Sequence, residues 1–423
     1  MVWHLDDLDQ LIIAGTACNT QTRSFNLFQQ HVVNFIAVTM TFNDSRRTVH
    51  LTHQAIVIKL ALLRTAALWQ WRGFVCAPAT TVAQLCAGLS ERLMADFIEP
   101  LCVSALNTPA RDASGQVFLR VLQDSLFSGR GGSHLLLPRR SMGALFPQAA
   151  AHWLQARGTA VRTGQRVQRL VLAPDGQQWQ VHCGPGVSNA PPGDATHLGT
   201  TSTATGSASH ASGAARRDLH EPTSARAPAP TAQPALQGFD HVTLACPPWE
   251  ASRLVAHAQG LGTQAQRAAQ AWSATASALR FEAITTVYAH ANGVRLPRPM
   301  LALRNTPEHP AQFVLDRGQL DEHHGLLAFV ISTSVGGRAQ TELAVQQQAA
   351  EQLALPAVQP VLTVVEKRAT FACTPGLVRP AARVLPMVQS LSACGDYVEG
   401  PYPATLEGAV LSGSAVSALA TTG

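Results

Sequence analysis

The stretch that decides the fold lies near the end of the chain, where Gly395-Asp396-Tyr397 is followed by Pro403-Ala-Thr-Leu-Glu-Gly-Ala-Val-Leu-Ser-Gly413. The first part predicts a turn with one carboxylate, and the second predicts a helix that begins at Thr405. The start of a helix offers unpaired N–H groups and a positive dipole end, which suit a phosphate or an electron-rich ring edge. Asp396 could accept hydrogen bonds from ribose or ribityl hydroxyls. The alternative is an ordinary capped helix behind a Gly-Asp turn.

Composition limits the number of cores that the chain can form and the classes of partner that it can bind. The chain has 423 residues, of which 46% are hydrophobic and only 13% charged, so it can bury two cores. The net charge is +5, but the arginines are dispersed and not interleaved with aromatic residues, which speaks against nucleic acid. Such a charge permits weak attraction to an anionic membrane surface.

The eight cysteines show no paired spacing typical of a metal site, so scattered reduced thiols are expected and no metal is predicted. No secretory signal opens the chain, which together with the thiols predicts a cytoplasmic location. The most apolar helical segment, Ala55 to Trp69, contains Lys59 and Arg64 and is too short to span a bilayer. It predicts a buried helix or, as the second alternative, a helix on the inner face of a membrane.

Hydrophobic spacing predicts the elements along the chain. Helical spacing runs from about 51 to 126 and again from 149 to 158, and alternation predicts strands at 165–171 and 179–182. A run from 189 to 236 is rich in Ser, Thr, Ala, Gly and Pro, and predicts a disordered insertion. The remaining predicted elements are strands at 240–246, 284–289, 300–304, 313–316, 326–332 and 361–368, and helices at 251–261 and 341–353.

Much of the chain resembles one family. The residues that carry the resemblance are Glu99–Cys102, Ala105–Pro109, Ala113–Leu119, Leu135–Arg139, Ala245–Glu250, Ile284–Tyr288, Glu366–Phe371 and Pro401–Ala409. In this order they resemble the hydroxysqualene dehydroxylase branch of the flavin amine oxidase and phytoene desaturase superfamily.

The resemblance implies an α/β fold in which a Rossmann-like FAD-binding domain is interleaved with a mixed sheet-and-helix substrate domain. It implies FAD as cofactor and an apolar triterpenoid as substrate, in squalene and hopanoid biosynthesis. The family reaction is the reductive removal of the hydroxyl of hydroxysqualene. The residues implied to bind the cofactor are Val167, Gly395, Asp396, Thr405, Leu406 and Glu407. The implied domain parts are a helical substrate part at 51–148, a FAD part at 149–255 with an insert at 184–237, a substrate part at 256–365 and a FAD part at 366–423.

The first fifty residues depart from the family pattern. The family begins with a strand, a Gly-x-Gly-x-x-Gly turn and a helix, whereas Gly15 is the first glycine here and Gly73 the next. Without these glycines the backbone cannot approach a pyrophosphate closely. Residues 1–50 are therefore interpreted as an atypical segment that replaces the expected dinucleotide-binding βαβ unit, so that this unit is incomplete. The chain as given is expected to bind FAD poorly. A non-catalytic remnant, or another desaturase or amine oxidase, stays open.

The catalytic acid is unknown from the sequence. The reaction of the family needs a proton source for the departing hydroxyl, and Asp316-Arg317, Asp124 and Glu282 are candidates. For each of them a structural salt bridge is the competing interpretation. His323-His324 lies in a polar turn and does not predict a site.

Overall fold

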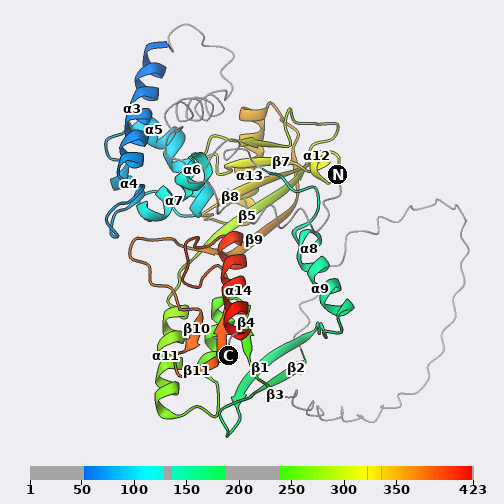
Figure 1. The fold of residues 1–423 in the computed structure, drawn as a ribbon. Coiled ribbons are helices and arrows are strands. Elements are labelled where there is room, and N and C mark those ends of the chain that lie inside the picture. Colours follow the sequence, from blue (N-terminus) through cyan, green and yellow to red (C-terminus); the bar gives the residue numbers. More distant parts are fainter. Residues whose placement is uncertain (1–51, 128–135, 186–237, 322, 335, 422–423) are drawn as a thin grey trace, which may run out of the picture.

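The computed structural model describes residues 52–127, 136–185, 238–321, 323–334 and 336–421 (Figure 1). The atypical segment 1–50 and nearly all of the predicted insert lie outside these residues. No helix among the described residues is long and apolar enough to cross a membrane. In the same part of the chain, no group of three or more His, Cys, Asp or Glu side chains could hold a metal ion.

The first described part is helical, as predicted. Its helices are α3 (Thr52–Trp71), α4 (Val82–Leu85), α5 (Glu91–Leu93), η1 (Met94–Ile98), α6 (Glu99–Leu106) and α7 (Gly115–Leu126). Side-chain caps set three of the starts, because Thr81 forms a capping box with Gln84, Ser90 accepts from the N–H of Leu93 and Ser114 accepts from the N–H of Val117. Phe118 and Leu119 of α7 are fully buried in the core of this part.

Helix α3 corresponds to the apolar segment at 55–69, which was predicted to be a buried helix, and it is only partly buried. Trp69 is buried in the helical core, whereas Leu60, Leu68 and Trp71 are exposed. The helix therefore packs along one side only.

The middle of the chain forms a small antiparallel sheet in the order β1-β2-β3. Its strands are β1 (Gln165–Leu172), β2 (Trp179–Pro185) and β3 (Gly238–Phe239), and they follow α8 (Met142–Leu145) and α9 (Pro147–Ala156). The period-two alternation at 165–171 and 179–182 thus predicted both long strands correctly.

A second three-stranded sheet combines distant parts of the chain in the order β10-β11-β4. The strands are β4 (Val242–Leu244), β10 (Arg383–Leu385) and β11 (Val388–Ala393), and the neighbouring helices are α10 (Pro248–Ala256), α11 (Thr263–Ser277) and α14 (Leu406–Thr421). β11 and β4 are parallel, and β10 is antiparallel to β11. The three strands, α10 and α11 share one core with β1 and β2, in which Trp179, Leu391 and Val255 are fully buried.

The third sheet has five antiparallel strands in the order β6-β7-β8-β5-β9. They are β5 (Phe281–His290), β6 (Met300–Ala302), β7 (Phe313–Asp316), β8 (Leu326–Ser332) and β9 (Gln359–Phe371), with α12 (Arg317–Leu320) and α13 (Arg338–Leu353) between them. One face packs on α13, where Val287, Phe329 and Val345 are fully buried.

Two features of the packing differ from the predicted domain parts. α11, for which no helix was predicted, packs against α10 in the core of the β10-β11-β4 sheet, although it follows the predicted boundary at 256. β9 extends to Phe371 in the five-stranded sheet, although it crosses the predicted boundary at 366. Phe371 is buried in the core of the β10-β11-β4 sheet, and Phe281 packs against that core. Strands β5 and β9 therefore contribute to two cores.

Candidate functional site

The parallel strands β4 and β11 end at the same edge of their sheet. Val242 lies opposite Leu391 and Leu244 opposite Ala393, and the N–H of Cys394 donates to the carbonyl of Leu244 at 3.1 Å. Each strand leads into a turn and then a helix, α10 after β4 and α14 after β11. Ligands of open α/β sheets bind at such carboxyl ends.

The turn that carries Asp396 is held by α14. The hydroxyl of Ser412 accepts from the N–H of Gly395 at 2.9 Å and lies 3.1 Å from its carbonyl oxygen. A Cβ at position 395 would come within 2.6 Å of the Tyr397 ring, so only glycine fits there without a shift. The N–H of Ala404 donates to the Asp396 carbonyl at 3.2 Å, which brings the start of α14 beside the turn.

Burial raises the pKa of the Asp396 carboxyl above its ordinary value. The N–H groups of Asp396 and Tyr397 and the positive charge of Arg379 oppose this shift. Arg379 is itself fixed, because its guanidinium donates to the carbonyls of Val398 and Gly400. The carboxylate is therefore partly desolvated and has one cation in its field, an arrangement that favours a ligand with hydroxyl donors.

We expect the stability of the cofactor-free protein to depend on pH through this group. An acid whose pKa is raised by folding holds its proton more tightly in the folded state. Its contribution to stability therefore falls as pH rises from the ordinary pKa through the folded pKa. Asp396→Asn should gain in unfolding free energy relative to the parent as the pH rises above about 4, the ordinary pKa of the carboxyl. Urea unfolding at several pH values measures the difference, with Asp175→Asn in an exposed turn as the control. A difference that is constant with pH would contradict the expectation.

Tyr397 supplies a test of whether a polar ligand fits here. The residue is 1% exposed, burial raises the pKa of its hydroxyl, and this hydroxyl has no hydrogen-bond partner among the described residues. A buried hydroxyl without a partner is costly, because it has lost its water and gained no other acceptor. Cys246 and Cys394, which follow the two parallel strands, lie in its electrostatic environment. The polar groups of a bound cofactor at this edge would satisfy it.

The start of α14 is built by Thr405, as the sequence predicts. Its hydroxyl accepts from the N–H of Gly408 at 3.0 Å and donates to the carbonyl of Tyr402 at 2.9 Å. Leu406 and Glu407 form the first turn, where N–H groups have no intrahelical acceptor. A Cβ at position 408 would overlap the Tyr402 carbonyl oxygen, so the loop lies directly against the helix at this glycine.

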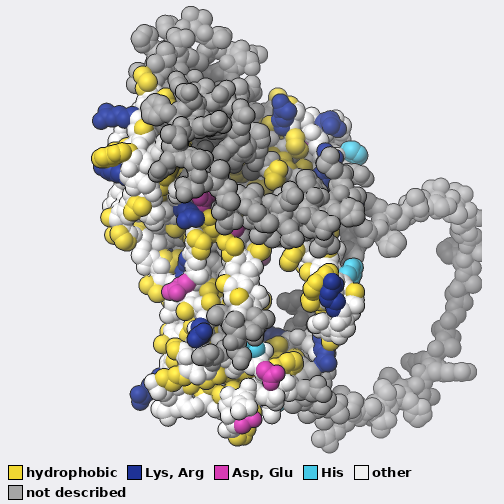
Figure 2. All heavy atoms as spheres, in the orientation of Figure 1, with side chains coloured by type: hydrophobic (Ala, Val, Ile, Leu, Met, Phe, Trp, Pro, Cys, Tyr) yellow, Lys and Arg dark blue, Asp and Glu magenta, His cyan; other side chains and the backbone are white. Residues whose placement is uncertain are grey.

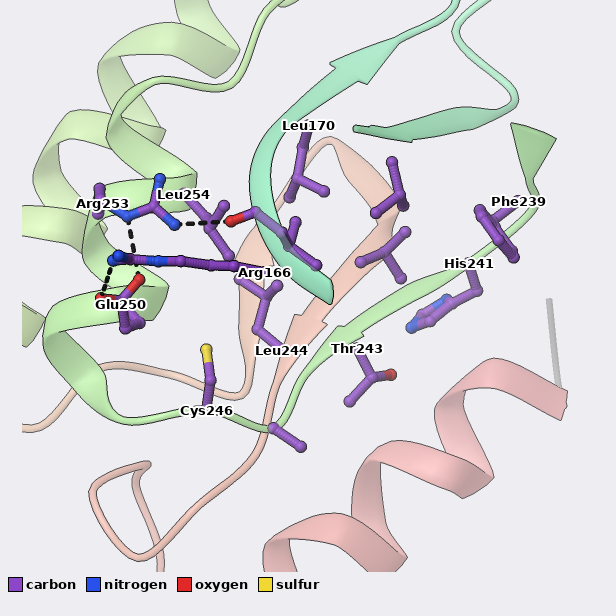
Figure 3. A pocket seen from close by; sticks show the side chains of 14 residues that line it. Arg166, Leu170, Phe239, His241, Thr243, Leu244, Cys246, Glu250, Arg253 and Leu254 are labelled. Atoms are coloured by element: carbon purple, nitrogen blue, oxygen red, sulfur yellow. Dashed lines mark hydrogen bonds and ion pairs between the residues drawn. The ribbon is translucent and has the colours of Figure 1, made fainter. Parts of the chain in front are cut away.

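A cavity of about 640 Å³ opens between β1, β4 and α10 (Figure 3). Glu250 of α10 holds two arginines at its wall, Arg166 at 2.6 Å and Arg253 at 3.0 Å. Arg253 also donates to the carbonyl of Val167 at 2.8 Å. Two guanidinium groups against one carboxylate leave a net positive charge beside an otherwise largely apolar wall.

The predicted cofactor residues fall into two groups. Val167 lines the cavity, whereas Gly395, Asp396, Thr405, Leu406 and Glu407 surround the start of α14. Both groups border one core, since Val167, Tyr397 and Ala404 all belong to or pack on it. Their roles as cofactor contacts stay predictions. The arginines of the cavity and Ser412 were not among the predicted site residues, because their partners lie far away in the sequence. The Tyr397 hydroxyl was not among them either, because its burial becomes visible only in the fold.

The three candidates for the catalytic acid differ in their contacts. Asp316 is 1% exposed and accepts from the N–H of Leu296, the N–H of Gly318 and the side-chain amide of Gln319, which is a structural role. Arg317 pairs with Asp321, and Asp124 pairs with Arg120 at 2.6 Å. Glu282 lies on β5 opposite Thr370 of β9.

The five-stranded sheet has a second face that does not pack on α13. Its residues follow from the register, in which Tyr288 pairs with both Ala328 and Leu362, and Thr286 pairs with both Val330 and Val364. We call this the outer face, and its large apolar members are Ile284, Tyr288, Met300, Phe313, Leu315, Val330, Leu362 and Val364. None of them belongs to a core cluster of the described residues. Glu282 is two residues from Ile284 on β5 and alternates onto the same face, although the pairing with β9 shifts register between these two residues. It lies at the end where β5 and β9 reach the core of the β10-β11-β4 sheet.

Comparison with known proteins identifies the fold. No family model and no curated protein sequence matches the chain. An oxidoreductase from Methanosarcina mazei is similar in structure, with a TM-score of 0.53 and 13% identity over 84% of this chain and 72% of that one. An A394C variant of putrescine oxidase has a TM-score of 0.52 and 11% identity, and covers 96% of this chain and 77% of its own. The chain thus has the mixed α/β, flavin amine oxidase-like fold expected from its sequence.

Proposed function

We propose that the protein is a FAD-dependent oxidoreductase that removes the hydroxyl of hydroxysqualene reductively to give squalene. The observation that carries the proposal is the outer face of the five-stranded sheet. From the apolar positions Tyr288, Leu362 and Val364, strands β5 and β9 continue past the polar Glu282, Glu366 and Thr370 to Phe281 and Phe371. Phe371 belongs to the core that contains Tyr397 and against which Ala404 packs, beside Asp396 and the start of α14. A long hydrocarbon needs an apolar surface near the cofactor, and the apolar part of the outer face would serve as one.

The cofactor half of the proposal rests on the edge of β4 and β11. Asp396 would accept from hydroxyls of FAD, the first-turn N–H groups of α14 would face its electron-rich groups, and the Tyr397 hydroxyl would gain a partner. Val167 and the two cavity arginines would lie beside a more distant part of the cofactor. Bound and reduced, FAD supplies the hydride for the reaction.

The substrate half rests on the chemistry of the departing hydroxyl. The hydroxyl needs a proton to leave as water, and the donor must be close to the end of the apolar surface that faces the cofactor. Glu282 meets this requirement by its position on the outer face. Its neighbour Phe281 packs against the core that contains Tyr397. We therefore assign it the role of proton donor, with the hydrocarbon held along Tyr288, Val330 and Leu362.

The test combines flavin binding with turnover. Protein saturated with FAD is reduced with dithionite and incubated with hydroxysqualene, and the extract is analysed for squalene. A second form carries an upstream strand, a Gly-x-Gly-x-x-Gly turn and a helix, because the first fifty residues lack this motif. Squalene from either form supports the proposal. Flavin-loaded, reduced protein that makes no squalene would eliminate the reaction, and failure of both forms to bind FAD would leave the non-catalytic alternative.

Asp396→Ala should weaken FAD binding. Loss of a hydrogen bond to a charged group costs about 1.5 kcal/mol, or roughly tenfold in Kd. Flavin absorbance after gel filtration, or titration of flavin fluorescence, measures the change. Asp175→Ala, in a turn outside the candidate site, is the matched control and should bind FAD like the parent. Equal occupancy in the Asp396 variant and the parent would refute the role of this carboxylate.

A further inference from the structure

One side of α3 presents a stripe of large apolar side chains to solvent. Leu60, Leu68 and Trp71 are 59%, 40% and 83% exposed, and Val75, just beyond the end of the helix, is 63% exposed. Steps of eight and three residues keep Leu60, Leu68 and Trp71 on one face of the helix, whereas Val75 follows a turn at Gly73 and Phe74, both of positive φ. We call Leu60, Leu68 and Trp71 the α3 stripe. Its large exposed tryptophan distinguishes it from scattered surface leucines, which need no explanation.

The opposite side of α3 anchors the helix to the protein. Trp69 is buried in the helical core, Leu62 packs on that core, and Phe74 follows the helix into it. The N–H of Phe74 donates to the carbonyl of Trp69 at 2.8 Å, which closes the end of the helix. The stripe therefore belongs to a helix that is fixed by its other face.

The stripe is accompanied by positive charge and by no acid of its own segment. Arg64 and Arg72 are exposed and share its face, four residues after Leu60 and four after Leu68. Between Asp44 and Glu91 the sequence contains no aspartate or glutamate, and its cations are Arg46, Arg47, Lys59, Arg64 and Arg72. Figure 2 shows hydrophobic and basic side chains together along the edge of the molecule where Figure 1 places α3.

We propose that the α3 stripe docks the protein on an anionic lipid bilayer, with the helix lying along the surface. Leucine and tryptophan gain by entering the boundary between headgroups and acyl chains, where tryptophan is the preferred aromatic residue. Arg64 and Arg72 then lie at the level of the lipid phosphates, which guanidinium groups bind well. The inference is independent of the cofactor and of the reaction, because it uses only α3.

Charge also favours an anionic lipid bilayer over a second copy of the chain as the partner of the α3 stripe. In a two-fold symmetric contact the same patch faces itself, so a dimer through the stripe would bring Arg64 and Arg72 of both copies into one interface. Four guanidinium groups without a carboxylate of this segment would oppose such a contact. An anionic surface accepts the same charges.

Co-sedimentation with vesicles tests the proposal. Vesicles of phosphatidylcholine with phosphatidylglycerol should bind the protein, and pure phosphatidylcholine should bind it much less. The variant Leu60→Ser/Leu68→Ser/Trp71→Ser should lose more than about tenfold in partitioning. Leu343→Ser/Val378→Ser/Met387→Ser replaces three other exposed apolar residues and is the matched control, which should bind like the parent.

A second variant tests the contribution of the two arginines beside the α3 stripe to vesicle binding. Arg64→Gln/Arg72→Gln should lose about fivefold per arginine, and the remaining binding should depend less on salt. Arg267→Gln, at an exposed position of α11, is the control. Equal partitioning of parent and stripe variant would overturn the proposal. So would a dimer in gel filtration that the stripe variant abolishes while vesicle binding is absent, because the occupant would then be a second copy.

Discussion

Gly408→Ala should lower the free energy of unfolding by about 3 kcal/mol, at the upper end of the usual cost of overpacking. An added Cβ would overlap the carbonyl oxygen of Tyr402, which is backbone and is held by the Thr405 hydroxyl. Neither atom can rotate away, so the loop must separate from α14. Thr405 then loses its contact with the N–H of Gly408, and the helix start that is proposed to face the cofactor opens.

The same helix offers a control with the opposite sign. Gly413 has open space around its missing Cβ, so Gly413→Ala should stabilise the protein by about 0.5–1 kcal/mol through helix propensity alone. Denaturant unfolding of the two variants measures the contrast, and flavin retention in the Gly408 variant should fall with it. Similar stabilities of both variants would show that the loop yields without cost.

Glu282→Gln should lower the rate of dehydroxylation by about 100-fold or more, the usual contribution of a positioned proton donor. Glutamine keeps the size of the side chain but carries no carboxyl proton for the departing hydroxyl. Flavin content and stability should remain those of the parent, because Glu282 lies on the outer face and not in a core cluster. Single-turnover reaction of the reduced, flavin-loaded protein with hydroxysqualene measures the chemical step.

Asp124→Asn separates this assignment from the rival carboxylate. Asp124 pairs with Arg120 on α7, and Arg120 also donates to the Tyr402 hydroxyl, so its contacts are structural. The variant should react within about twofold of the parent, as expected for a partly exposed pair of little energetic weight. A large loss in Asp124→Asn with a normal rate in Glu282→Gln would reverse the assignment.

Local patterns predicted many of the elements, though not α11, β10 or β11, because the signals of the predicted ones are contained in a few neighbouring residues. Alternation gave β1, and the Thr405 cap gave the start of α14 within one residue. α11 was missed because its buried face is made of Ala265, Ala269, Trp272 and Ala276, whose helical spacing is present but whose alanines carry little hydrophobic contrast.

Long-range relations could not be predicted in the same way. The cavity charges join Arg166 to Glu250 across the insert, and the outer face exists only through the pairing of β5 with β8 and β9. Register is set by the packed sheet, since a shift by one residue would exchange its two faces. The conclusion that Asp316 is structural likewise needed its three donors, two of which are backbone groups.

The three cores differ in how much of the chain must exist before each can close. The helical core uses residues between Trp69 and Leu122, and the core under α13 uses residues between Val287 and Val358. The core beneath the candidate cofactor site joins Leu170 to Val398. During synthesis the first two can form soon after their segments leave the ribosome, while the third must wait for the last part of the chain. The Asp396 turn is thus assembled last, on two units that are already folded.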